Sequence, residues 1–158
     1  MQAEHINPFL SSLKNTFSTM LACDVRRGDF HLKNGESPTH PISGVIGLSG
    51  KAVGTVVINL SESVALKAAS AMLLSEMTEV NEDVLDAVGE IANMVAGAAK
   101  SELEQYELSV SLPNVVVGNP HVIHFPSNAT PICVPYDTDW GPLNLEVGLE
   151  TITEPVAT

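Results

Sequence analysis

The chain has 158 residues, of which 44% are hydrophobic and 16% are charged, and its mean hydropathy is +0.18. This length and composition suit one folded domain over residues 1–158 and exclude a largely disordered chain. Nineteen acidic residues against seven lysines and arginines give a formal net charge of −12. That charge argues against nucleic acid or an anionic membrane as partner. A protein that offers a lysine or a basic surface fits better, although an acidic surface usually serves solubility alone.

The compartment is predicted from what the chain lacks. Its apolar runs are far shorter than a membrane span, and its first residues lack the basic segment and apolar run of a signal peptide. Cys23 and Cys133 are far apart and match no metal-ligand spacing, which indicates two reduced, buried thiols. We therefore expect a soluble cytoplasmic protein without a metal or cofactor of its own.

Three helices are predicted along the chain. Residues 8–22 place apolar side chains at helical spacing, with Asn7 as N-cap and Pro8 in the first helical position. A second helix is predicted over residues 62–74. The third and longest begins after an N-cap at Asn81 and runs to about residue 106.

The remaining segments predict strands. A hairpin joins residues 42–48 to residues 52–60 through Ser49-Gly50-Lys51, and a proline interrupts the later extended segment 108–117. Runs of strands separated by helices predict an α+β fold, with an antiparallel or mixed sheet and two long helices packed on one face. The other predicted extended segments are residues 24–33, 122–125, 132–136 and 144–150.

The third helix carries the residues of chemical interest. Its apolar stripe is expected to face the core and consists of Val84, Leu85, Val88, Ile91, Ala92 and Val95. Glu90 and Asn93 are three residues apart and project together from the polar face, and Asp86 lies four residues before Glu90. Taken alone, this spacing is more typical of an ordinary solvated helix face than of a functional site.

Small residues surround this polar pair. Gly89 and Gly97 each cost helix propensity of up to roughly 1 kcal/mol, which suggests that they have another role. They would let the backbone of another protein approach closely, or they would let two helices of this chain pack tightly. The five histidines are scattered, and Asp137 and Asp139 form an acidic turn, so neither group predicts an active site.

A wider pattern decides between these interpretations. Asp86, Glu90, Asn93 and the later Pro113 match the motif of the CheC/CheX/FliY family of chemotaxis phosphatases, although Pro113 follows slightly sooner than in that motif. The chain resembles this family over nearly its whole length. The matching blocks are NPF at 7–9, SGVIGLSG at 43–50, DAVGEIANMVAG at 86–97, SLPNVVVG at 111–118 and GPLNLEVGLE at 141–150.

The resemblance also indicates a branch of the family. CheC-like members carry the Glu-x-x-Asn motif on two pseudo-symmetric helices, whereas the first helix here offers Ser12 and Asn15 without the carboxylate. One intact site per chain resembles the CheX-like members. Those members form homodimers through joined sheets, so the resemblance implies a homodimer.

The resemblance implies a reaction as well. The substrate would be the phospho-aspartate of a CheY-like response-regulator receiver domain, with Asn93 orienting the in-line water and Glu90 pairing with the receiver's lysine. Mg²⁺ would be held by the receiver. Asp86, Gly89 and Gly97 would contact the receiver, although Asp86 fits equally well as an early-turn carboxylate that the helix dipole favours.

Two alternatives of a different class remain at this point. The chain could dock on a receiver without catalysing hydrolysis, or it could be a structural dimerisation module. The intact Glu90 and Asn93 favour an aspartyl-phosphate phosphatase. The pattern fits a chemotaxis receiver and a receiver of another two-component circuit equally well.

Overall fold

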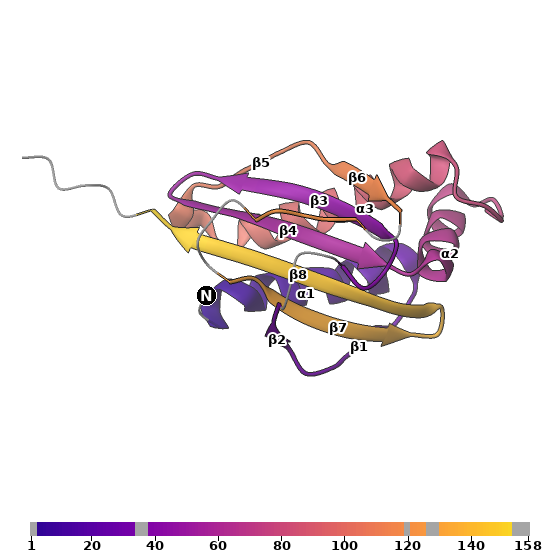
Figure 1. Cartoon of the computed structure of the whole chain (residues 1–158), viewed down its shortest axis with the longest axis horizontal. Coiled ribbons are helices and arrows are strands. Elements are labelled where there is room, and N and C mark those ends of the chain that lie inside the picture. The colour runs from indigo at the N-terminus through magenta and orange to yellow at the C-terminus, as the bar shows by residue number, and fades with distance from the viewer. Residues whose placement is uncertain (1–2, 34–37, 119–120, 126–129, 153–158) are drawn as a thin grey trace, which may run out of the picture.

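One antiparallel sheet and three helices on one of its faces form the fold in the computed structural model, which describes residues 3–33, 38–118, 121–125 and 130–152 (Figure 1). The helices are α1 (Ala3–Leu21), α2 (Glu62–Leu73) and α3 (Glu82–Ser101), followed by the 3-10 turn η1 (Glu104–Tyr106). The strands are β1 (Arg26–Arg27), β2 (His31–Leu32), β3 (Ile42–Ser49), β4 (Ala52–Leu60), β5 (Ser109–Val110), β6 (Asn114–Val117), β7 (Ile132–Thr138) and β8 (Gly141–Thr151).

The sheet is built around its two longest strands. β4 and β8 pair from Ala52 opposite Thr151 to Leu60 opposite Leu143. The strand order is β1-β7-β8-β4-β3-β5, while β2 also pairs with β7 and β6 also pairs with β3. Every pairing is antiparallel, and β3–β4 and β7–β8 are hairpins. The predicted α+β class and the predicted hairpin are confirmed.

The core lies between the sheet and the helices, which run behind the strands in Figure 1. Alternate side chains of a strand point to opposite faces, so one face of β8 reaches the helices through Leu143, Leu145, Val147 and Leu149. Phe9, Leu13 and Phe17 of α1 meet them at spacings of four residues and are fully buried. Helical periodicity in α1 and strand alternation in β8 thus supply the two sides of one core.

The first helix begins earlier than we predicted. It starts at Ala3, and Pro8 lies inside it instead of at its first position. Proline cannot donate the hydrogen bond of its turn, but the residues before it are held by the rest of the fold. Ile6 is buried, and His5 Nε2 lies 2.7 Å from the hydroxyl of Tyr106 in η1. These tertiary contacts keep the turn before Pro8 helical.

Three of the predicted extended segments differ from the structure. Residues 24–33 pair only as the two-residue strands β1 and β2. Residues 108–117 form two short strands, β5 and β6, because a bend at residues 111–113 separates them. Residues 121–125 form no strand. They cross the face of the sheet that the helices leave uncovered, where Phe125 lies against Gly148. Ile123 is buried and Phe125 packs on the sheet, whereas Val122 is 51% exposed, and the backbone of the segment joins no ladder.

The face of the sheet opposite the helices also holds buried polar groups. The Asn59 amide bridges the backbone of His40 and the hydroxyl of Ser43, and Ser43 Oγ lies 2.8 Å from Nε2 of His121. Nearby, Lys33 Nζ pairs with Glu146 Oε1 at 3.0 Å, with both side chains buried. Each of these buried polar groups therefore has a partner, although no described helix covers this face of the sheet.

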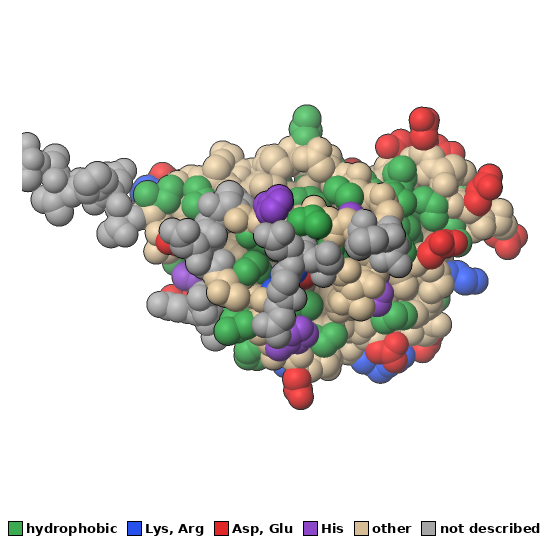
Figure 2. Space-filling view, viewed as in Figure 1, with side chains coloured by type: hydrophobic (Ala, Val, Ile, Leu, Met, Phe, Trp, Pro, Cys, Tyr) green, Lys and Arg blue, Asp and Glu red, His purple; other side chains and the backbone are tan. Residues whose placement is uncertain are grey.

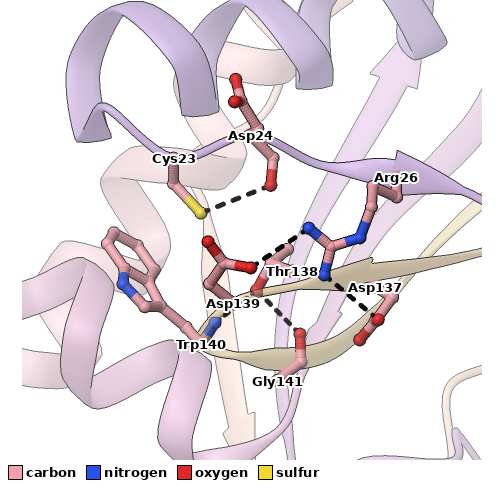
Figure 3. A network of polar contacts seen from close by, with 8 residues as sticks. All are labelled: Cys23, Asp24, Arg26, Asp137, Thr138, Asp139, Trp140 and Gly141. Atoms are coloured by element: carbon pink, nitrogen blue, oxygen red, sulfur yellow. Dashed lines mark hydrogen bonds and ion pairs between the residues drawn. The ribbon is translucent and has the colours of Figure 1, made fainter.

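The turn between β7 and β8 is fixed by side chains (Figure 3). Arg26 of β1 lies 3.2 Å from carboxylate oxygens of both Asp137 and Asp139, and Thr138 Oγ1 donates to the carbonyl of Gly141 at 2.8 Å. The two ion pairs are solvent-exposed, so their contribution to stability is small. The acidic turn is therefore a structural feature of the sheet edge.

The two cysteines are free and buried, as predicted. Among the described residues, no helix has the long apolar stretch that crossing a membrane requires.

Candidate active site

α3 is a helix of 20 residues with a side-chain cap at its N-terminus. The Asn81 side chain accepts a 3.0 Å hydrogen bond from the backbone N–H of Val84, which satisfies one of the free donors of the first turn. Glu82 and Asp83 lie in the first turn and Lys100 in the last, so these charges complement the helix dipole. The 20-residue helix is thus a firm support for exposed side chains.

The exposed side of α3 is a single line of residues. Asp86, Glu90, Asn93 and Gly97 are all exposed and follow each other at spacings of four, three and four. The opposite side is buried, with Leu85 half-buried at its margin, as the predicted stripe requires. The buried residues are Val84, Ala87, Val88, Gly89, Ile91, Ala92, Val95, Ala96 and Ala99.

Glu90 and Asn93 are available to a partner. Within the described ranges, no side chain or backbone group bonds to the carboxylate of Glu90 or the amide of Asn93. Three residues of helix separate them by about 4.5 Å along the axis. A carboxylate and an amide at this separation can bind a cation and a water molecule that lie side by side.

The height of α3 above the sheet is set by a glycine on β3. A Cβ atom at Gly44 would lie 2.9 Å from the Cβ of Ala92 and 3.3 Å from the carbonyl oxygen of Val88. Those two residues lie on the buried side of α3, two residues before and two residues after Glu90. The absence of a side chain at Gly44 therefore allows the helix to lie close against the sheet.

Gly89 packs within the chain. It is buried, and a Cβ there would meet Val115 Cγ2 at 3.4 Å and Pro113 Cγ at 3.5 Å. This contact differs from the predicted role of Gly89 as a surface offered to a partner, and it explains why Pro113 belongs to the same pattern. The proline borders α3 one residue before Glu90.

Gly97 has a different environment. It is exposed, no described atom lies within 4 Å of where its Cβ would be, and it borders a shallow hollow of about 400 Å³. Lys100 and Leu108 also line this hollow. The open space beside Gly97 leaves room for the backbone of another molecule.

The first helix does not repeat the site. Ser12 is buried, and its hydroxyl donates a 2.6 Å hydrogen bond to the carbonyl of Val95 on α3. Asn15 is exposed on a different part of α1. Of the two residues at the motif spacing on this helix, Ser12 therefore serves helix packing and Asn15 faces solvent.

One exposed apolar residue beside α3 was not predicted. Leu112 immediately precedes Pro113 and is 87% exposed. In the sequence it is only an isolated leucine next to a proline. The contact between Pro113 and Gly89 shows that this leucine lies near α3.

Comparison with known proteins agrees with this geometry. The family described as Chemotaxis phosphatase CheX matches residues 42–137, which run from β3 through α3 into β7. The match contains Asp86, Glu90, Asn93 and Pro113 and covers more than half of the chain. The chain belongs to the CheX family of chemotaxis phosphatases.

Individual CheX-like proteins give the same result. A curated relative from Thermotoga maritima, named CheY-P phosphatase CheX, is 30% identical over 121 residues, covering 75% of this chain and 78% of the relative. The crystal structure of the chemotaxis protein CheX from Vibrio vulnificus is 34% identical, with a TM-score of 0.86 over 94% of this chain and 100% of that one.

A second solved structure is a complex. The CheX-CheY-BeF3-Mg complex from Borrelia burgdorferi contains a chain that is 19% identical to this one, with a TM-score of 0.80 over 94% of this chain and 99% of that one. At this identity the likeness concerns the fold alone.

Proposed function

We propose that this chain hydrolyses the phospho-aspartate of a CheY-like receiver domain, with Asn93 orienting the attacking water and Glu90 pairing with a lysine of the receiver. The observation that carries the proposal is the exposure of Glu90 and Asn93, without a partner in the described part of the chain, on one line of a capped helix. Two polar side chains on a firmly held helix suit a reaction that depends on positioning.

The relatives support the choice of substrate. The Thermotoga maritima relative is named for action on phosphorylated CheY, and the Borrelia burgdorferi structure holds a CheX protein together with CheY, beryllium fluoride and magnesium. The net charge of −12 suits a partner that presents a lysine. Receivers act in the cytoplasm, so we propose that this chain does too.

The chemistry of Asn93 fits the slow step. An acyl phosphate hydrolyses when water attacks phosphorus in line with the bond to the aspartate oxygen. Phosphoryl transfer has a loose transition state, so little base strength is required and placement of the water matters most. A carboxamide donates and accepts hydrogen bonds, and it can therefore hold that water in one orientation. A hundredfold acceleration requires only about 2.7 kcal/mol.

Glu90 would fix the register of the two proteins. An ion pair between its carboxylate and a lysine near the phosphoryl group places Asn93, three residues further along α3, beside the phosphorus atom. We propose that Mg²⁺ is held by the receiver's own acidic residues. Asp86 and Gly97 extend the same line and would contact the receiver on either side of the pair.

The test is phosphate release from a phosphorylated receiver. We expect the wild-type chain to accelerate release, Asn93→Ala to remove nearly all of the acceleration, and Glu90→Gln to raise KM and lower kcat. Asn15→Ala and Glu62→Gln are matched controls, because both residues are exposed on other helices, and we expect them to retain full activity.

The outcomes separate the proposed functions. Release no faster than from the receiver alone, with binding intact, would identify a non-catalytic receiver-binding module. Full activity in Asn93→Ala would show that the assigned roles are wrong. We also propose a homodimer, as in other CheX-like members, and light scattering that gives a monomer at micromolar concentration would contradict it.

A further inference from the structure

The bend between β5 and β6 presents a leucine to solvent. Leu112 is 87% exposed, and Figure 2 shows hydrophobic atoms standing out above this segment, away from the other green surfaces. A single exposed leucine is common on protein surfaces and means little by itself. The local structure and the position of Leu112 make this one informative.

The backbone that carries Leu112 is held on both sides. Ser111 N donates to the carbonyl of Gly47 at 2.9 Å, and Gly47 N donates to Ser111 Oγ at 2.8 Å. The Ser111 hydroxyl in turn donates to the carbonyl of Leu112 at 2.9 Å. On the other side, Pro113 has a fixed φ and leads directly into β6. The fold thus fixes the backbone and leaves the apolar side chain in water.

The segment that carries Leu112 runs along α3, because both β5 and β6 contact that helix. Leu108 lines the same hollow as Gly97, whereas Pro113 contacts Gly89, so the segment from 108 to 113 runs back along α3. Leu112 therefore lies between the levels of Gly97 and Gly89. Asn93 lies between them too, and it is only about 40° around the helix axis from the Gly89 side.

We propose that Leu112 is a docking residue for the receiver, inserting into an apolar recess next to its phosphorylated aspartate. The inference rests on the proposed function. A receiver that reaches Asn93 and Glu90 must cover the edge of α3 where Leu112 stands, and that contact removes the leucine side chain from water. Polar groups at the centre then perform the chemistry, and an apolar residue beside them supplies affinity.

A pre-fixed leucine suits this role better than a mobile one. No loop has to be ordered when the receiver binds, so most of the free energy of burying the side chain appears as affinity. Leu112 acts on binding alone and touches no reacting atom. Its removal should therefore raise KM and leave kcat unchanged.

The test compares two leucine variants of the full chain. Leu112→Ser removes the proposed contact, and Leu32→Ser is the control, because Leu32 is 60% exposed on β2 at the opposite edge of the sheet. Phosphate release is measured against the concentration of phosphorylated receiver. We expect Leu112→Ser to raise KM about tenfold with kcat within twofold of wild type, and Leu32→Ser to change neither.

Direct binding provides a second measurement. The Kd for a receiver carrying beryllium fluoride and magnesium should rise about tenfold in Leu112→Ser as well. Unchanged KM and Kd in Leu112→Ser, with an active wild type, would overturn the docking role and leave the proposed function standing. A fall in kcat alone, or a change of oligomeric state in light scattering, would also overturn it. No activity in the wild type would instead contradict the proposed function.

Discussion

The hydroxyl of Ser12 on α1 donates a 2.6 Å hydrogen bond to the carbonyl of Val95 on α3. Val95 lies on the buried side of α3, two residues after Asn93. The bond therefore joins the two long helices at the level of the candidate site. The helix that carries the exposed pair is held by the sheet below it and by a neighbouring helix at its side.

Loss of this bond should weaken the protein measurably. Ser12→Ala is expected to lower the free energy of unfolding by about 1 kcal/mol, because a buried hydrogen bond of this kind contributes about that much. Ser11→Ala is the control, since Ser11 is exposed on the same helix. Urea unfolding of both variants gives the two values, and equal stability of the two would contradict the role of the bond.

The two glycines of α3 should respond differently to alanine. Both substitutions should stabilise the helix by up to about 1 kcal/mol, because a Cβ fits at ordinary contact distance at Gly89 and meets nothing at Gly97. Gly89 is buried under Pro113, so Gly89→Ala should leave KM for the receiver unchanged. Gly97→Ala should raise KM if the receiver backbone approaches there. Denaturation and steady-state kinetics on both variants separate stability from docking.

Much of the site could be predicted because it is local. α3 is specified by its cap, its apolar spacing and its polar line, all of which lie within about twenty residues. The β3–β4 hairpin is local for the same reason. The contact of Pro113 with Gly89 and the early start of α1 depend on residues far apart in the sequence. Those two features could not be predicted, because they form only when the distant segments pack together in the folded core.

The segment at residues 122–125 is a strand prediction that was wrong. Its apolar residues read as a strand, yet it crosses the sheet face as irregular backbone. Local pattern does not tell whether the backbone pairs with a neighbour, and within this segment only Ile123 is buried.

Leu74 offers a stabilising substitution. It ends α2 with φ 53° and ψ 38°, a left-handed conformation that is unfavourable for leucine, and its side chain is 92% exposed. Asparagine tolerates this conformation, so Leu74→Asn should raise the free energy of unfolding by about 0.5–1 kcal/mol. Leu73→Asn, one residue earlier in the helix, should instead destabilise. A thermal melt of both variants tests the contrast, and a loss of stability in Leu74→Asn would refute it.

Alkaline pH should destabilise the fold in part through Cys133. Burial, with a smaller contribution from Glu146, raises the pKa of the Cys133 thiol to about 11 from the ordinary value of 9.0. The unfolded chain therefore loses this proton first. The stabilising effect is complete below pH 9 and is lost as the pH rises towards 11. Urea unfolding at several pH values should show a shallower decline in Cys133→Ala, and parallel curves for variant and wild type would argue against it.

The close approach of α3 to β3 at Gly44 makes the reach of the exposed pair adjustable from inside the protein. A methyl group at this position would press on Ala92 and Val88 and lift the middle of α3 by a few tenths of an ångström. Glu90 and Asn93 would then extend further from the surface without any change to their own chemistry. The position of the exposed pair therefore depends on core residues beneath α3 as well as on the exposed line itself.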